Sequence, residues 1–238
     1  MRKLLISDIT IMGRGYCVIG LEHSEHSFRS VRPLPPRANS WARFPYRRGE
    51  ILHFLLSLLP TEGPHKEDRP STGVLGKAGQ VSEKDLVGYL RRAEVAENLS
   101  DLFGCAVHEN PRGSGIYVEP NQGARSICGF EMRNIRIQLF ADAVRATVLL
   151  PSGEPLRDLP VVDRDWNEFI SRLLQKTTGA NRLQRANHYL NVGVPEKVLN
   201  DPNRFVRIGL TRLHNNKHWL MLDSLFPLPQ MTWLNELS

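Results

Sequence analysis

The sequence predicts a mainly β protein with some α-helix, built from two OB-like small β-barrels in tandem, each with an accessory helix. Three observations lead to this class. Short apolar runs rich in Ile and Val dominate the chain, and a cycle of about four to six such runs with one helix occurs twice. A stretch rich in Gly, Asn and Pro at 104–126 separates the cycles as a linker. Two SH3-like barrels fit the same count, and periodicity does not separate these alternatives.

The first domain is expected to span 1–120 and to begin with a hairpin. Its predicted strands are, in order, 3–12, 16–22, 27–34 and 50–59. A "GRG" turn joins the first two strands, and prolines stop the third. A polar loop follows the fourth strand, and leucines at helical spacing then predict a helix near 82–102 with Ser82 as its N-cap.

The second domain is expected to span 121–238. Its predicted strands are 135–140, 143–150, 155–162, 189–194, 205–213 and 218–225. An apolar stripe predicts a helix near 163–176, with Asp163 as its N-cap. The sequence "HNNK" predicts a tight turn between the last two strands.

Composition indicates a globular protein with a real core. The chain has 238 residues, of which 41% are hydrophobic and 24% charged. No apolar run approaches the roughly 20 residues that span a bilayer, and no cleavable leader is evident. Three widely spaced cysteines fit a reducing compartment and are expected to be buried small hydrophobes. We therefore expect a soluble, cytoplasmic protein without a membrane partner.

An arginine-rich stretch carries the strongest functional signal. The chain has a net charge of +6, and residues 26–49 contain six arginines, four interleaved aromatic rings and no acid before Glu50. Arginines neutralise phosphates, and exposed rings stack on bases, so this composition predicts a nucleic-acid surface. The predicted contacts are Arg29, Arg32, Arg43, Arg47, Arg48, Trp41, Phe44 and Tyr46, with a smaller group of Arg207, Arg212, Lys217 and Trp219 in the second half. The alternative is that the rings are core and the arginines a solvated face.

The polar loop "GPHKEDRP" raises the question of catalysis. His65, Glu67 and Asp68 are residue types that bind metals or move protons. The same residues would also suit ligand contact, or a rigid proline-bracketed loop whose acids pair with arginines. No companion ligands are evident, and the glycines at 73–79 lack the phosphate-loop spacing. We expect no catalytic residue, no metal and no cofactor.

Several short motifs together resemble the dual OB-fold domain family of bacterial and archaeal proteins. They are "KLLISDITIMGRGYCVIGLE", "RSVRPL", "PHKED", "LPVVDRDW", "VRIGLTR" and "WLMLDSLFPLP". The resemblance covers most of 3–229 and implies two OB-like barrels and nucleic-acid binding, often in bacterial conflict or mobile-element systems. The family's distinctive residues fall on Arg32, Pro33, His65, Glu67, Asp68, Asp163, Trp166, Gly209, Arg212 and Trp219. "IGLTR" lacks the acid often seen after Gly-Leu, which puts a role for that loop in doubt.

These observations favour a non-enzymatic protein that binds nucleic acid, single-stranded DNA or RNA rather than duplex, as an accessory component of a prokaryotic defence or mobile-element system. OB surfaces present strands and loops and no groove-reading helix. One alternative is a protein-interaction module that docks an effector enzyme encoded nearby. A second alternative is a metal-dependent hydrolase or nuclease that uses the "PHKED" loop.

Overall fold

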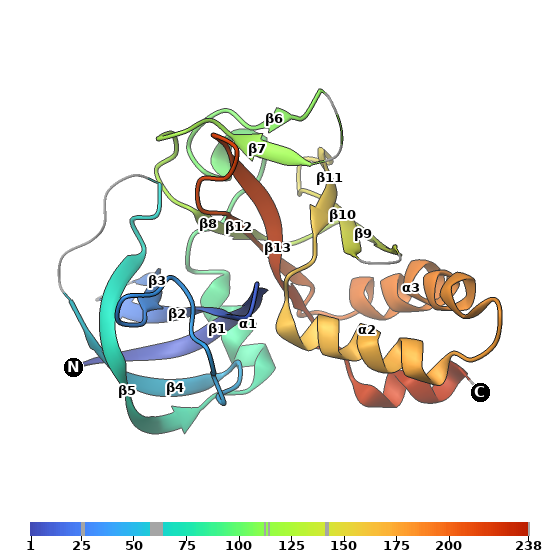
Figure 1. Ribbon diagram of the computed structural model, residues 1–238, viewed down its shortest axis with the longest axis horizontal. Helices are drawn as coiled ribbons and strands as arrows, with labels where there is room; N and C mark the ends of the chain where they lie inside the picture. The colour runs from blue at the N-terminus through green and yellow to red at the C-terminus, as the bar shows by residue number, and fades with distance from the viewer. Residues whose placement is uncertain (25–26, 58–63, 112, 114, 141–142, 238) are drawn as a thin grey trace.

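The computed structural model describes residues 1–24, 27–57, 64–111, 113, 115–140 and 143–237, with the side chains described as far as 235. The N-terminal strands gather on one side of the molecule, and the C-terminal sheets and helices lie on the other (Figure 1). The fold is mainly β.

Five strands of the N-terminal part form a closed barrel. They are β1 (Arg2–Met12), β2 (Gly15–Ser24), β3 (Ser27–Leu34), β4 (Glu50–Leu56) and β5 (Asp68–Gln80), in the order β1-β2-β3-β5-β4. The β4 strand closes the barrel by pairing antiparallel with β1, and β3 pairs parallel with β5. Leu4, Ile6, Val18, Leu52 and Phe54 fill the interior. This closed order is compatible with an OB-like barrel.

The first four predicted strands are confirmed, whereas β5 is missing from the prediction. The last two positions predicted for the fourth strand, 58 and 59, lie outside the described residues. The β5 sequence "DRPSTGVLGKAGQ" contains proline and glycine, which are depleted in strands. Pairing with both β3 and β4 holds it in place, and its register with β4 shifts at three points.

The helix predicted near 82–102 is too long. The α1 helix spans Glu83–Leu90, and Ser82 caps it as predicted by accepting a hydrogen bond from the Asp85 amide. The chain then leaves the helix and pairs with β8 (Ile127–Phe130): the Gly129 amide donates to the Glu94 carbonyl over 2.9 Å. A short 3-10 turn, η1, follows at Leu99–Asp101. Tertiary pairing thus overrides helical spacing here.

The second half consists of two sheets and three helical segments. The five-stranded sheet has the order β6 (His108–Glu109), β7 (Ile116–Val118), β13 (His218–Phe226), β12 (Phe205–Leu210) and β8. The three-stranded sheet has the order β11 (Pro155–Pro160), β10 (Val144–Leu149) and β9 (Asn134–Leu139). An isolated bridge from Val161 to Leu222 joins the two sheets. Among the residues that the structure describes, these strands form two sheets, neither of which closes into a barrel.

The α2 helix (Arg164–Lys176) confirms the second predicted helix, and Asp163 caps it by accepting from the amides of Asp165 and Trp166. The strand predicted at 189–194 is wrong, because these residues lie inside α3 (Arg182–Leu199). Ala186, Tyr189, Leu190 and Val194 are buried at helical spacing. A short apolar run does not by itself distinguish a strand from one face of a helix. The chain ends in η2 (Met231–Leu237).

The predicted linker at 104–126 carries structure. It contains β6 and β7, and Ile116 and Val118 are buried in the core of the second half. Leu102 and Phe103 belong to the same core, so the packing changes from barrel to C-terminal half before residue 120, where the boundary was predicted. Cys128 is buried, Cys17 and Cys105 are half-buried, and all three are free thiols. Over the described chain, no helix combines the length and apolar character needed to cross a bilayer.

Candidate functional site

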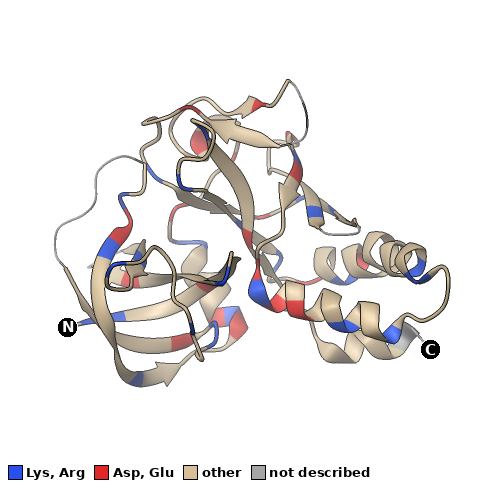
Figure 2. Ribbon diagram, in the orientation of Figure 1, with Lys and Arg blue, Asp and Glu red and all other residues tan. Residues whose placement is uncertain are grey.

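Arg48 is part of a buried ion-pair cluster and is almost completely shielded from solvent. Its side chain is 1% exposed, and its two Nη atoms donate to the carboxylate of Asp163 over 3.0 Å each. The Nε atom donates to Asp165 over 2.7 Å. Basic and acidic segments meet at the start of α2, as Figure 2 shows. The prediction that Arg48 holds a nucleic-acid backbone is therefore wrong, because its donors fasten the loop before β4 to α2.

Arg32 is buried as well. Its Nη1 pairs with Asp68 at 3.1 Å, and its Nη2 donates to the Ser126 hydroxyl over 3.3 Å. These contacts link β3 to the start of β5 and to the residue before β8. The prediction that Arg32 contacts phosphate is wrong for the same reason as for Arg48.

Arg207, also predicted as a nucleic-acid contact, reaches from β12 into the barrel wall. It is 2% exposed, it pairs with Asp8 of β1 at 3.2 Å, and it donates to the Ser30 hydroxyl of β3 over 2.6 Å. This prediction is also wrong, because the guanidinium joins the two halves of the molecule. Buried arginines at such joints need carboxylate partners, and each of the three has one.

The aromatic rings of the arginine-rich stretch pack against one another. Phe44 is 5% exposed and lies in the barrel core, where Trp41 and Tyr46 contact its ring at centroid distances of 6.0 and 5.3 Å. The Trp41 indole N–H donates to the Pro33 carbonyl over 2.9 Å. The prediction that Phe44 stacks on bases is wrong, whereas Trp41 and Tyr46 are only half-buried. For Phe44, the alternative interpretation, in which the rings belong to the core, is therefore the one that the structure supports.

Arg29, Arg43 and Arg47 are exposed, but no cavity described is lined by more than one of them. Arg29 donates to Glu22 through Nε and Nη2 over 2.8 and 2.5 Å, and half of its side chain faces solvent. Arg47 lines a groove of about 670 Å³ beside α2, whereas Arg29 lines a different cavity. Arg43 lies on the surface and lines neither.

The "PHKED" loop joins the barrel to the second half. Glu67 is buried and accepts hydrogen bonds from the Ser126 amide and hydroxyl over 2.7 and 2.9 Å. Asp68 is 0% exposed and is shared between Arg32 and Arg212. Both acids thus point at polar groups of the interior, as the structural alternative for this loop requires.

His65 completes this cluster as a neutral ring. Its Nδ1 lies 3.0 Å from Arg32 Nη1, and its ring meets the His218 ring edge-on at 5.4 Å. Burial, together with the charges of Arg32 and Arg212, lowers the pKa of His65 to about 2. Across the described residues, no group of three or more His, Cys, Asp or Glu side chains is placed to hold a metal ion.

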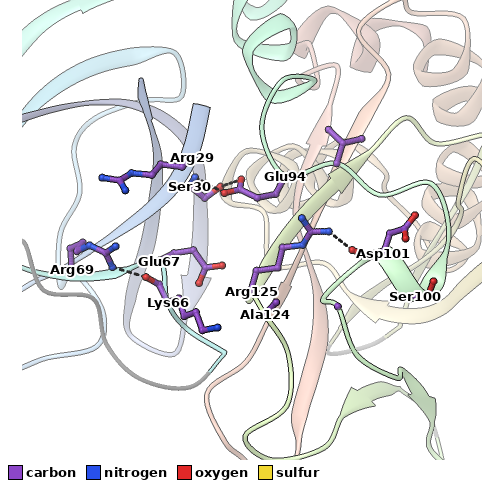
Figure 3. A pocket seen from close by; sticks show the side chains of 12 residues that line it. Arg29, Ser30, Lys66, Glu67, Arg69, Glu94, Ser100, Asp101, Ala124 and Arg125 are labelled. Atoms are coloured by element: carbon purple, nitrogen blue, oxygen red, sulfur yellow. Dashed lines mark hydrogen bonds between the residues drawn. The ribbon is translucent and has the colours of Figure 1, made fainter. Parts of the chain in front are cut away.

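A charged cleft lies between the barrel and the segment that runs from α1 to β8. Its volume is about 690 Å³. Barrel residues line one wall, and residues from 94 to 125 line the other (Figure 3). Its basic side chains are those of Arg29, Lys66, Arg69 and Arg125. Lys66 belongs to the "PHKED" loop, so this loop forms part of the wall.

The acids of the cleft are already occupied by donors of the protein. Glu94 accepts from the Ser30 amide and hydroxyl over 2.9 and 2.7 Å, and Glu67 holds Ser126. Asp101 accepts weakly from the Glu97 amide over 3.3 Å. By contrast, Lys66 is exposed, and Arg29 keeps one Nη outside its contacts with Glu22. The cleft therefore offers Lys66 and one Nη of Arg29 to a ligand, while Glu94 and Glu67 already hold donors of the protein.

Sequence reasoning missed Lys66, Arg69 and Arg125 as cleft residues. Arg69 donates to the carbonyls of Lys66 and Asp68, and Arg125 donates to the carbonyls of Leu102 and Asp101, so both are held in place. Arg125 lies in the predicted linker, and its distance in sequence from Arg29 hides their proximity. In the sequence, the only signal for this cleft was the basic residues of the polar loop "GPHKEDRP".

Lys217 and Trp219 form a separate cluster at the edge of the five-stranded sheet. Lys217 Nζ lies 3.4 Å from the centre of the Tyr117 ring, which contacts Trp219 at 5.6 Å and His108 at 5.4 Å. Lys217 and Trp219 are partly exposed, so the prediction that they contact nucleic acid remains a prediction. Arg212, predicted with them, is 38% exposed and pairs instead with Asp68.

Comparison with protein-family models, with curated proteins and with solved structures finds no match to this chain.

Proposed function

We propose that this protein binds single-stranded nucleic acid, with the sugar–phosphate backbone of the strand held in the cleft lined by Arg29, Lys66, Arg69 and Arg125. The observation that carries the proposal is that these four cations, which come from both halves of the molecule, line one cleft beside acids that backbone and hydroxyl donors already occupy. Neutralising phosphates with such cations supplies affinity that does not depend on sequence.

The barrel supports a strand over a duplex as the ligand. In OB-folds, oligonucleotides lie across strands 2 and 3 and the loop between strands 4 and 5. Here Arg29 comes from β3, and Lys66 comes from the β4–β5 segment. A duplex would call for a helix or a two-stranded ribbon placed to enter a groove.

The same proposal includes membership of the dual OB-fold family and a second OB-like barrel in the C-terminal half. It also includes a cytoplasmic role beside a defence or mobile-element system. The shared core of the two C-terminal sheets and the Val161–Leu222 bridge support a barrel-like unit there. The short motifs support the family, and no comparison adds to them.

The test compares two variants with the same loss of charge. Arg29→Gln/Lys66→Gln removes two cleft cations, and Arg182→Gln/Lys84→Gln removes two exposed cations elsewhere, so each lowers the net charge from +6 to +4. Fluorescence anisotropy with labelled single-stranded DNA and RNA at low salt is expected to show at least about tenfold weaker binding for the cleft variant only. Equal losses in both variants would mean that binding is diffuse and not in the cleft. No binding by the unaltered protein, together with recovery of a protein partner, would favour the interaction-module alternative.

A further inference from the structure

Three ring side chains form an aromatic row across one edge of the five-stranded sheet, on β6, β7 and β13. In the strand register, His108 lies opposite Tyr117, and Tyr117 lies opposite Trp219. The ring centroids are 5.4 Å apart from His108 to Tyr117 and 5.6 Å apart from Tyr117 to Trp219. Figure 1 shows β6 and β7 at the top of the molecule, at the edge of this sheet.

The aromatic row lies on the outer face of the sheet. Successive side chains of a strand point to opposite faces. Ile116 and Val118, on either side of Tyr117, are buried in the core of the second half, and His218, which precedes Trp219, is buried as well. All three rings of the row are only half-buried. The row therefore faces away from the core and contacts solvent.

The largest ring of the row is held in place by the backbone around it. The Trp219 indole N–H donates to the His214 carbonyl over 3.1 Å, and the Trp219 amide donates to the Thr211 hydroxyl over 2.9 Å. A Cβ atom at Gly115 would lie 3.2 Å from the indole, so glycine allows the chain before β7 to approach the ring. A ring fixed in this way loses little conformational entropy when a ligand packs on it.

A single cation accompanies the rings. Lys217 lies two residues before Trp219, on the same face of β13, and its Nζ is 3.4 Å from the centre of the Tyr117 ring and 5.5 Å from that of Trp219. Among the residues that the structure describes, Lys217 has no carboxylate partner, and Glu109, the acid next to His108, is paired with Arg157. The charge of Lys217 is therefore available to an anion beside the rings.

We propose that the aromatic row stacks unpaired bases of a single-stranded nucleic acid, with Lys217 as the partner of a phosphate of the same strand. Sheets that carry rings on neighbouring strands stack two or three bases in this way. A cation–π contact at an exposed site contributes less than the stacking of a base. An incoming base therefore displaces Lys217 from the Tyr117 ring and leaves its ammonium group beside the strand.

The cation favours a strand over other ligands that pack on aromatic rings. A neutral sugar brings no charge for Lys217 to neutralise, and a cationic side chain of a protein partner would be repelled by it. A strand uses both the rings and the charge. This inference rests on the proposed function, because the ligand is the same single strand, but none of the residues of the row lines the charged cleft.

Fluorescence anisotropy with a labelled oligothymidine strand and an abasic strand of the same length and charge tests the aromatic row. The unaltered protein is expected to bind the strand with bases at least about fivefold more tightly, because only that strand can stack. Trp219→Leu should remove this preference. Trp233→Leu, which changes another half-buried tryptophan with a lysine near its ring, should keep it. Circular dichroism melting shows whether both variants remain folded.

A second variant and the cleft variant complete the test. His108→Leu, on the short edge strand β6, should weaken the preference even where Trp219→Leu unfolds the protein. Arg29→Gln/Lys66→Gln should weaken binding of both strands by the same factor and keep the preference. If it binds both strands as the unaltered protein does, only the cleft is contradicted. Equal binding of the two strands by the unaltered protein, or a preference that survives in folded Trp219→Leu and in His108→Leu, overturns the aromatic row as a base platform.

Discussion

Asp223 of β13 is buried with no hydrogen-bond partner for its Oδ1 among the residues that the structure describes, and it illustrates at the scale of one residue how such a group links stability to pH. Burial, reinforced by the nearby charge of Asp8, raises its pKa to about 7, against the lowering effect of Arg32 and Arg207. The folded protein therefore holds a proton on Asp223 over a pH range in which the unfolded chain has lost it. Stability falls as pH rises from about 4 to about 7 because of this group.

We predict that Asp223→Asn stabilises the protein at pH 8 and has little effect at pH 4.5. The shift from 3.8 to about 7 sets an upper bound of about 4 kcal/mol on the gain, reduced by whatever hydrogen bonds the new amide lacks. Urea unfolding at the two pH values measures it. A variant less stable than the unaltered protein at pH 8 would show that the carboxylate is stabilised by contacts other than those described.

The roles of single arginines could not be predicted from the sequence. The stretch at 26–49 indicated a basic surface, but its composition does not show which guanidinium groups are buried. Arg48 pairs with residues 115 and 117 positions away, and Arg207 with a hydroxyl 177 positions away. Only the tertiary fold brings these partners together. Arg29 pairs instead with Glu22, only 7 positions away, and half of its side chain stays exposed.

At the scale of elements, the joint between the barrel and α2 depends on Arg48. The guanidinium connects the loop before β4 with the N-terminal cap of α2, and the Arg48 side chain also lies 5.1 Å from the centre of the Phe226 ring. Asp163 additionally accepts from the Leu225 amide of β13 over 2.9 Å. Three elements thus meet at one buried ion pair.

We predict that Arg48→Met lowers the free energy of unfolding by about 3–5 kcal/mol, because it leaves the buried carboxylate of Asp163 without its cation. Arg47→Met, at the adjacent exposed position, is the matched control and should change it by no more than about 0.5 kcal/mol. Urea denaturation at pH 7 compares the two. Similar, small effects of both changes would contradict the structural role assigned to Arg48.

The elements themselves were predictable where local signals agreed with tertiary packing. The β1–β2 hairpin, β3, and the caps of α1 and α2 follow from apolar runs, turn residues and cap chemistry, all of which are local. The β5 strand was not predictable, because its glycines and proline oppose strand formation and pairing on both sides imposes it. Residues 189–194 of α3 were predicted as a strand because an apolar run of this length is too short to reveal the helical period of 3.6 residues.

At the scale of the whole molecule, charge is divided between a buried and an exposed set. Arg48 and Arg207 hold the two halves together through the carboxylates of Asp163 and Asp8, and Arg32 does so through the Ser126 hydroxyl. The cations of the cleft lie at the opening between the same two halves. The joint that stabilises the fold thus also positions the surface proposed to bind a strand. The "PHKED" loop serves both, since Glu67 and Asp68 face inward and Lys66 faces the cleft.

The salt dependence of strand binding tests this arrangement most directly. For single strands the slope of log K against log salt concentration is about −0.7 for each phosphate contact. A titration of labelled single-stranded DNA and RNA over 50–300 mM salt should therefore give a clearly negative slope for the unaltered protein, and a slope about 1.4 less steep for Arg29→Gln/Lys66→Gln. The Arg182→Gln/Lys84→Gln control should keep the original slope. Identical slopes for all three proteins, or binding that does not respond to salt, would contradict a strand held in the cleft.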